Sequence, residues 1–180
     1  MKKRILTVLL SVAVILTCLT ACGGKAEEET GFFSAFTTTT LDGEECTQKI
    51  FKGNKVTMVN IWGTFCSPCI NEMPDLEQLS KNYADKGLVL IGVVNDTFDY
   101  FKDENDPDKI EKAKNIIERT GVTYTNLLPS ESLNEAKLDR VSTFPTTYFL
   151  DENGDILGEY VGSRSYDQWA TIVDTILEAL

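Results

Sequence analysis

The chain has 180 residues, of which 42% are hydrophobic and 25% charged, the composition of a globular domain and not of a disordered or fibrous chain. Its formal net charge of −11 argues against binding to nucleic acid or electrostatic attachment to anionic lipid. The absence of histidine excludes Ser-His-Asp catalysis, Cys-His catalysis and histidine-ligated metal sites. Five cysteines carry most of the functional information.

The first 22 residues have the pattern of an export signal that ends in a cysteine. Three basic residues precede an apolar run over 5–19. The tetrapeptide LTAC at 19–22 resembles the lipobox of bacterial lipoproteins, which are cleaved before the cysteine and lipidated on its sulfur. We therefore expect 1–21 to be a signal peptide, Cys22 to be lipidated, and 22–31 to be a flexible tether. A plain signal peptide or an uncleaved anchor is the alternative.

Residues 32–180 alternate strand patterns with helix patterns, which predicts one α/β domain with a mixed sheet. The predicted strands are 36–41 and 44–47, joined as a hairpin at Asp42-Gly43, followed by 56–62, 88–94, 124–128, 146–151 and 156–161. The predicted helices are 70–83, with a kink at Pro74, then 110–121, 133–140 and 166–180. The acidic segment 96–108 contains Pro107 and is predicted to be a loop.

Two cysteines, in the motif Cys66-Ser67-Pro68-Cys69, lie between a predicted buried strand and a predicted helix. Two intervening residues let one helical turn bring the sulfurs within bonding distance, and the helix N-terminus favours a thiolate. Cys66 is predicted to be the exposed nucleophile and Cys69 the buried resolving thiol. A redox site is favoured over an inert disulfide, and also over a zinc site, for which only Cys46 remains as a further ligand.

Two segments then resemble a known superfamily. Residues 62–74, WGTFCSPCINEMP, resemble the thioredoxin active site, and the Glu-x-Pro within them is similar to the TlpA/ResA-like branch of membrane-anchored extracytoplasmic thiol-disulfide oxidoreductases. Residues 144–151, FPTTYFLD, are similar to the cis-proline segment that faces the CxxC in this family. The resemblance covers 32–180. It implies a thioredoxin-like fold with a central mixed β-sheet, helices on both faces, an N-terminal β-hairpin, an αβ insertion at 107–128, and a Cys66–Cys69 redox disulfide without cofactor or metal.

A departure from the thioredoxin pattern bears on proton transfer. Thioredoxins proper carry a buried aspartate six residues before the first cysteine, where this chain has Asn60. An amide cannot take a proton from Cys69, so another group or solvent must take it. Glu72, one helical turn after Cys69, is the candidate proton acceptor, as the family resemblance also implies. The alternative is a solvated glutamate that complements the helix N-terminus.

Three residues are predicted to form a substrate groove beside the cysteines: Trp62, Phe144 and Pro145. Trp62 is expected to serve in packing as well, and Phe144 could equally be a core aromatic. A cis bond at Pro145 would leave the backbone of Phe144 free to pair with an extended substrate. The unpaired Cys46 is predicted to be a small buried apolar side chain, ahead of a regulatory thiol.

The leading functional prediction is a thiol-disulfide oxidoreductase, lipid-anchored on the extracytoplasmic face of a bacterial cell membrane. The resemblance implies that it reduces disulfides of exported proteins and is itself reduced by a membrane thiol-disulfide electron carrier. The alternatives are a disulfide-forming oxidant, an anchored binding or metal-delivery module with a non-catalytic CxxC, and a peroxiredoxin-like peroxidase. The last is disfavoured because Gly63 stands where a Thr or Ser is needed.

Overall fold

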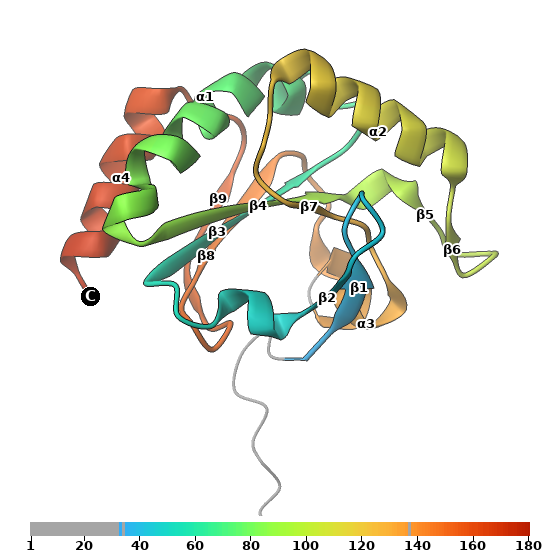
Figure 1. Cartoon of the computed structure of the whole chain (residues 1–180), viewed down its shortest axis with the longest axis horizontal. Coiled ribbons are helices and arrows are strands. Elements are labelled where there is room, and N and C mark those ends of the chain that lie inside the picture. Colours follow the sequence, from blue (N-terminus) through green and yellow to red (C-terminus); the bar gives the residue numbers. More distant parts are fainter. Residues whose placement is uncertain (1–32, 34, 137) are drawn as a thin grey trace, which may run out of the picture.

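The computed structural model describes residues 33, 35–136 and 138–180. The predicted signal peptide, the predicted lipidation site Cys22 and the predicted tether lie outside these residues. A five-stranded sheet forms the centre of the molecule, with a layer of structure on each side (Figure 1). No helix in the described part of the chain is long and apolar enough to cross a membrane.

The central sheet is mixed, as predicted, and its strand order is β7-β4-β3-β8-β9. The strands are β3 (Val56–Trp62), β4 (Leu88–Val94), β7 (Asn126–Leu127), β8 (Thr146–Leu150) and β9 (Ile156–Val161). Strand β4 runs parallel to β3 and β7, whereas β8 is antiparallel to β3 and β9. Every residue of β3 is buried, including the polar Thr57 and Asn60, which explains why this central strand is mostly apolar and does not alternate between apolar and polar residues.

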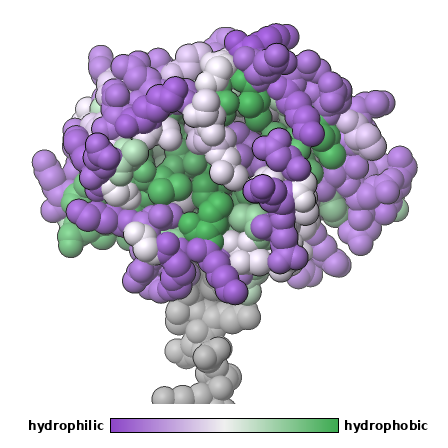
Figure 2. All heavy atoms as spheres, in the orientation of Figure 1, coloured by the Kyte–Doolittle hydropathy of each residue, from purple (hydrophilic) through white to green (hydrophobic). Residues whose placement is uncertain are grey.

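Helices cover both faces of the sheet, which confirms the predicted thioredoxin-like architecture (Figure 1). One layer contains α1 (Ser67–Tyr83), α2 (Pro107–Thr120) and α4 (Tyr166–Glu178). The other contains η1 (Gln48–Phe51), α3 (Glu131–Ala136), η4 (Leu138–Arg140) and the hairpin of β1 (Thr37–Thr39) and β2 (Glu45–Thr47). Figure 2 shows, in the same view, apolar side chains gathered in the middle of the molecule between hydrophilic outer surfaces. The two hydrophobic cores therefore lie on opposite faces of one sheet.

The segment 96–108 is not simply a loop, and that prediction is wrong. It contains most of η3 (Asn95–Thr97) and a small hairpin of β5 (Phe98–Asp99) and β6 (Glu104–Asn105), and its last two residues begin α2. Pro107 occupies the first turn of α2, where its missing N–H costs little, and the Asp106 side chain caps the helix by accepting from the backbone of Asp108. The proline is therefore a helix start here.

Other boundaries differ by a few residues. The predicted helix 133–140 is divided into α3 and η4, and β7 is shorter than the predicted strand 124–128. Helix α2 ends at Gly121, which has a φ of 73°, as its sequence pattern indicates. Pro74 lies inside α1, and the helix continues beyond it to Tyr83.

Candidate active site

The two cysteines of the CxxC motif form a disulfide where β3 ends and α1 begins. The Cys66–Cys69 S–S distance is 2.03 Å and the Cα atoms are 5.3 Å apart. Cys66 is the N-cap of α1, and its Sγ accepts a hydrogen bond of 3.3 Å from the Cys69 N–H. Cys66 is 6% exposed and Cys69 is 0% exposed. Cys66 is therefore the more accessible of the two cysteines, but it is largely covered and not the exposed residue that the sequence predicts.

A tight turn precedes the first cysteine. The Cys66 N–H donates to the Gly63 carbonyl at 3.0 Å, so Thr64 and Phe65 are the central residues of the turn. Thr64 faces inward and is buried, while Phe65 faces outward and is 63% exposed. A Cβ at Gly63 would lie only 2.9 Å from the Phe65 ring, so glycine allows that ring to fold back over the turn.

The aromatic ring of Phe65 reaches the cis-proline segment. Its centroid lies 5.8 Å from that of Phe144 in an edge-to-face arrangement. The Phe144–Pro145 peptide bond is cis, Pro145 is buried, and Phe144 is half-buried against both hydrophobic cores. Phe144 thus combines the two roles that the sequence left open, because its ring packs on the core and also meets an exposed residue next to Cys66.

Trp62 does not line a groove. Its side chain is entirely buried, and its Nε1 donates to Asn126 Oδ1 at 2.9 Å. The prediction that Trp62 also forms a groove wall is therefore wrong, because no part of the ring is available to a substrate. Its position at the end of β3 makes it part of the floor on which the CxxC turn rests.

Glu72 is buried, at 3% exposure, and is held by neutral donors. Its Oε1 accepts from Asn60 Nδ2 at 3.1 Å, and its Oε2 accepts from the Arg164 backbone N–H at 3.0 Å and from Trp169 Nε1 at 3.4 Å. Burial raises the pKa of Glu72, and the hydrogen bonds from Arg164, Asn60 and Trp169 offset only part of that rise. A solvated role for this carboxylate is excluded by its burial.

Asn60 joins Glu72 to Thr147 in a buried hydrogen-bond network. Besides Glu72, its Nδ2 also contacts Thr147 Oγ1 at 3.0 Å. Its Oδ1 is buried and has no hydrogen-bond partner within the described part of the chain. Asn60 therefore occupies the place that the thioredoxin pattern gives to an aspartate, and the carboxylate is supplied instead from α1 by Glu72.

Comparison with known proteins identifies the family. Residues 27–175 match the family described as Redoxin. The chain belongs to the redoxin family. This redoxin is 37% identical over 131 residues to the thioredoxin-like protein YneN of Bacillus subtilis (strain 168), covering 72% of this chain and 69% of YneN. It is 31% identical over 140 residues to the thiol-disulfide oxidoreductase ResA of Bacillus thuringiensis subsp. konkukian (strain 97-27). That match covers 74% of this chain and 69% of ResA.

The solved structures agree with this identification. A thiol:disulfide interchange protein of the thioredoxin family from Chlorobium tepidum TLS has a TM-score of 0.62 at 27% sequence identity, over 80% of this chain and 94% of that one. With the Cys66–Cys69 disulfide at the start of α1, these matches establish this redoxin as a ResA-like thiol-disulfide oxidoreductase of the thioredoxin superfamily. The predicted family, fold and enzyme class are confirmed.

Several residues that hydrogen-bond to Thr64 and Glu72, on either side of the disulfide in the chain, were not found from the sequence. Asp96, Arg164 and Trp169 reach the site from segments far along the chain, and no local pattern marks them. Phe65 could have been noticed, because it is an aromatic residue directly before the first cysteine. The sequence therefore locates the sulfurs and misses most of what surrounds them.

Two further features of this redoxin lie apart from the disulfide. Cys46 is a free, buried thiol whose pKa is raised by burial, and it packs in the core with Phe36 and Phe51, in agreement with a small apolar role.

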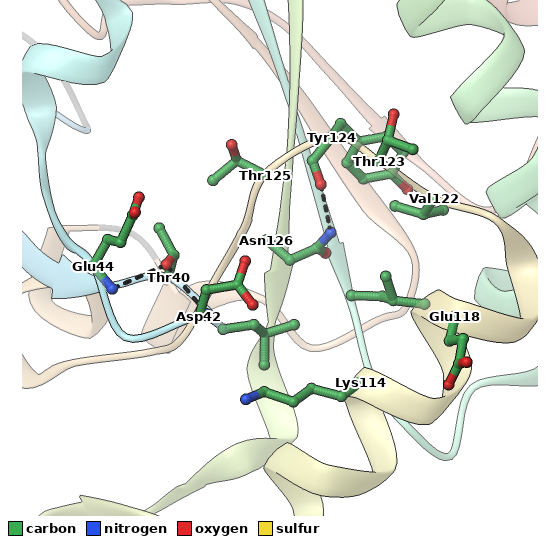
Figure 3. Close-up of a pocket in the computed structure, with 12 residues that line it drawn as sticks. Thr40, Asp42, Glu44, Lys114, Glu118, Val122, Thr123, Tyr124, Thr125 and Asn126 are labelled. Carbon is green, nitrogen blue, oxygen red and sulfur yellow. Dashed lines mark hydrogen bonds between the residues drawn. The ribbon is translucent and has the colours of Figure 1, made fainter.

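A cavity of about 370 Å³ lies between the β1–β2 turn, the end of α2 and residues 122–126 (Figure 3). The active-site cysteines are not among the described residues that line it. Within 33, 35–136 and 138–180, no group of three His, Cys, Asp or Glu residues could hold a metal ion.

Proposed function

We propose that this redoxin is a lipid-anchored, extracytoplasmic reductase of disulfides in exported proteins. The observation that carries the chemistry is the Cys66–Cys69 disulfide at the N-terminus of α1, with the buried carboxylate of Glu72 one turn further along. The export pattern of 1–21 and the lipobox-like sequence before Cys22 support the location. In this proposal 22–31 is a tether and 32–180 is the catalytic domain.

In the first step, the Cys66 thiolate attacks one sulfur of the substrate disulfide. A Cys66–substrate S–S bond forms as the substrate S–S bond breaks, and the released substrate sulfur takes a proton from water. The Cys69 N–H, which contacts Cys66 Sγ, and the positive end of the α1 dipole stabilise the thiolate that attacks.

In the second step, Cys69 attacks Cys66 and releases the second substrate thiol. Cys69 is fully buried, so its proton needs an acceptor inside the protein. Glu72 lies on the same side of α1, and because its pKa is raised it takes up a proton more readily than a surface glutamate. The Cys66–substrate S–S bond breaks as the Cys66–Cys69 disulfide forms, and the departing substrate sulfur takes a proton from water. Two electrons have then passed to the substrate, and a membrane thiol-disulfide carrier reduces the Cys66–Cys69 disulfide again.

Phe65 and Phe144 supply the docking surface in this proposal, and the buried Pro145 shapes the backbone beside them through its cis peptide bond. The exposed Phe65 ring and the half-buried Phe144 ring present apolar area beside the more accessible sulfur. An extended polypeptide with apolar side chains next to its cysteines would bury that area on binding.

The reduction potential tests the direction of electron flow. We expect a value close to that of a thioredoxin, on the order of −270 mV, when the pair is equilibrated with a glutathione or dithiothreitol series. A value on the order of −120 mV would reverse the assignment to that of a disulfide-forming oxidant.

Cys66→Ser should abolish turnover, whereas Cys69→Ser should accumulate mixed disulfides with exported proteins.

The anchor is tested separately from the chemistry. Cys22→Ala should release the protein from membranes or leave it unprocessed, and mass spectrometry of the native protein should find lipid on Cys22. An unmodified N-terminus at another residue, on a freely secreted protein, would reject the lipid anchor and leave the exchange chemistry intact.

A further inference from the structure

The turn before Cys66 is held by a carboxylate from another part of the chain. Asp96, in η3 directly after β4, accepts the Thr64 N–H on Oδ1 at 2.8 Å and the Thr64 hydroxyl on Oδ2 at 2.7 Å. Both carboxylate oxygens are thus used on a single residue. Thr64 is buried, so water cannot easily replace these two charge-assisted hydrogen bonds if they are lost.

Asp96 is itself held in place from two sides. Lys109 Nζ, on α2, donates to the Asp96 carbonyl at 2.7 Å. The adjacent Thr97 is fully buried, and its hydroxyl contacts the Val94 carbonyl at 3.0 Å and Asn105 Oδ1 at 2.7 Å. The carboxylate is therefore fixed before it meets Thr64, and the β4–α2 connection acts as a rigid support for the CxxC turn.

The two hydrogen bonds from Thr64 to Asp96 determine where the next two residues, Phe65 and Cys66, lie. With Thr64 held inside the turn, Phe65 is directed outward and Cys66 is placed at the N-cap of α1. We propose that Asp96 is a positioning residue for thiol-disulfide exchange, which acts through Thr64 to hold Cys66 in its attacking position and Phe65 at the docking surface. The proposal rests on Cys66 being the sulfur that exchanges with substrate, as proposed above. In the opposite direction of electron flow the substrate thiolate attacks Cys66, and the same contacts hold it for that attack.

The molecule contains a matched clamp away from the disulfide. Glu77 accepts the Thr123 N–H on Oε2 at 2.7 Å and the Thr123 hydroxyl on Oε1 at 2.6 Å. Thr123 lies in the wall of the cavity in Figure 3, and Glu77 is about two turns along α1 from Cys69. The same donor and acceptor groups thus join two segments without touching the cysteines. Glu77 is buried like Thr64, whereas Thr123 is exposed, so this pair is a control for the loss of a carboxylate that accepts twice from one threonine.

The experiment compares Asp96→Ala, Asp96→Asn and Glu77→Ala in the full-length reduced protein. Attack on a small aromatic disulfide is followed by absorbance, and the mixed disulfide is mapped by mass spectrometry. We expect Asp96→Ala to slow attack about tenfold, because two hydrogen bonds to a charged acceptor are lost. Asp96→Asn should stay within about threefold of the wild-type rate, because the amide can still accept from the Thr64 N–H and can donate to its hydroxyl.

The reduction potential gives a second measurement that a purely structural role would not change. Asp96→Asn removes a negative charge near Cys66, which favours the thiolate, so we expect a higher, more oxidising potential. Glu77→Ala should leave both the rate and the potential at wild-type values. Thr64→Ser keeps both hydrogen-bond donors, so this variant should react at the wild-type rate. Thr64→Val removes only the hydroxyl and should slow attack about threefold.

Two results would overturn the proposal. One is a wild-type rate and potential in Asp96→Ala, and the other is an equal slowing by Glu77→Ala in folded protein. If Asp96→Ala does not fold, Thr64→Val decides, since a wild-type rate in that variant is also contrary to the proposal. A mixed disulfide that maps to Cys69 in the wild type would instead reject the proposed order of attack.

Discussion

Glu72 and Glu77 lie little more than one turn apart on α1 and are both buried, yet the fold stabilises opposite protonation states of the two carboxyls. Burial alone would raise the pKa of Glu77, but hydrogen bonds from Lys81, at 2.8 Å, and from Thr123 outweigh it and lower that pKa. Burial dominates at Glu72 and raises its pKa. The carboxylate next to a cation serves structure, and the one among neutral donors is available for proton transfer.

Arg164 shows how this difference is maintained. Its backbone N–H reaches Glu72, but its guanidinium donates to the carbonyls of Val161 and Gly162 and lies over the ring of Trp169 at 4.9 Å. Among the described residues, no side-chain ion pair reaches Glu72. A positive charge is thus close by and is directed elsewhere, so it offsets little of the effect of burial.

The largest expected effect concerns the resolution step. Glu72→Gln should slow the release of a mixed disulfide at neutral pH by about a hundredfold, because Cys69 loses its proton acceptor. The lifetime of the mixed disulfide after mixing reduced protein with substrate measures this rate. Glu77→Gln is the matched control and should resolve the mixed disulfide at the wild-type rate. Equal rates in the two variants would remove the functional distinction between the carboxylates.

The next effect is on folding. Glu77→Ala should lower the free energy of unfolding by about 1 to 2 kcal/mol at neutral pH, because the two hydrogen bonds from Thr123 to a charged acceptor are lost, although water can reach the exposed Thr123. Urea unfolding followed by circular dichroism measures the change. Loss of stability without loss of exchange activity is the expected result, and a slower exchange reaction would place Glu77 in the catalytic group after all.

The pH dependence of stability should differ in sign between the two positions. The stability that ionised Glu77 contributes is present above the ordinary carboxyl pKa and is lost as the pH falls through its lowered value. The pKa of Glu72 is raised in the folded protein, so the opposite holds there. As the pH rises from the ordinary carboxyl pKa through the raised pKa, the free energy of unfolding of the wild type falls relative to that of Glu72→Gln. Unfolding curves of the two glutamine variants between pH 3 and 8 test this, and parallel profiles would contradict it.

The smallest expected effect is at the cation. Lys81 is paired with Glu77, but its side chain is 64% exposed, so solvent screens the pair. Lys81→Met should cost about 0.5 kcal/mol of stability in low salt and less in high salt. A cost as large as that of Glu77→Ala would mean that Lys81, and not Thr123, is the main partner of the carboxylate.

The elements that the sequence predicts best are those determined by local pattern. Strands β3 and β4 have the predicted bounds because a strand buried on both faces is mostly apolar along its whole length. The cysteine pair and the proline before β8 were found because their chemistry restricts the residues at those positions. Pro107 was misread because a proline breaks a helix interior and begins a helix equally well.

The surroundings of the site could not be predicted in the same way. Glu72 meets Arg164 and Trp169, more than 90 residues away in the chain, only because α4 packs against α1. Trp62 was given a place in the groove because it is an aromatic close to the cysteines, and its burial depends on Asn126 from a different strand. Partners of this kind follow from how the elements pack together, and no spacing in the sequence encodes them.

The hydrogen bond between Trp169 and Glu72 gives the enzyme an optical signal of its own. The chain has two tryptophans, and both are fully buried. The indole of Trp169 donates to the Glu72 carboxylate at 3.4 Å, whereas that of Trp62 donates to the neutral amide of Asn126. A change in charge at Glu72 therefore alters the field at one indole far more than at the other. Intrinsic fluorescence should follow the proton on Glu72 in unlabelled protein, with Trp169→Phe removing the signal and Trp62 remaining as an internal reference.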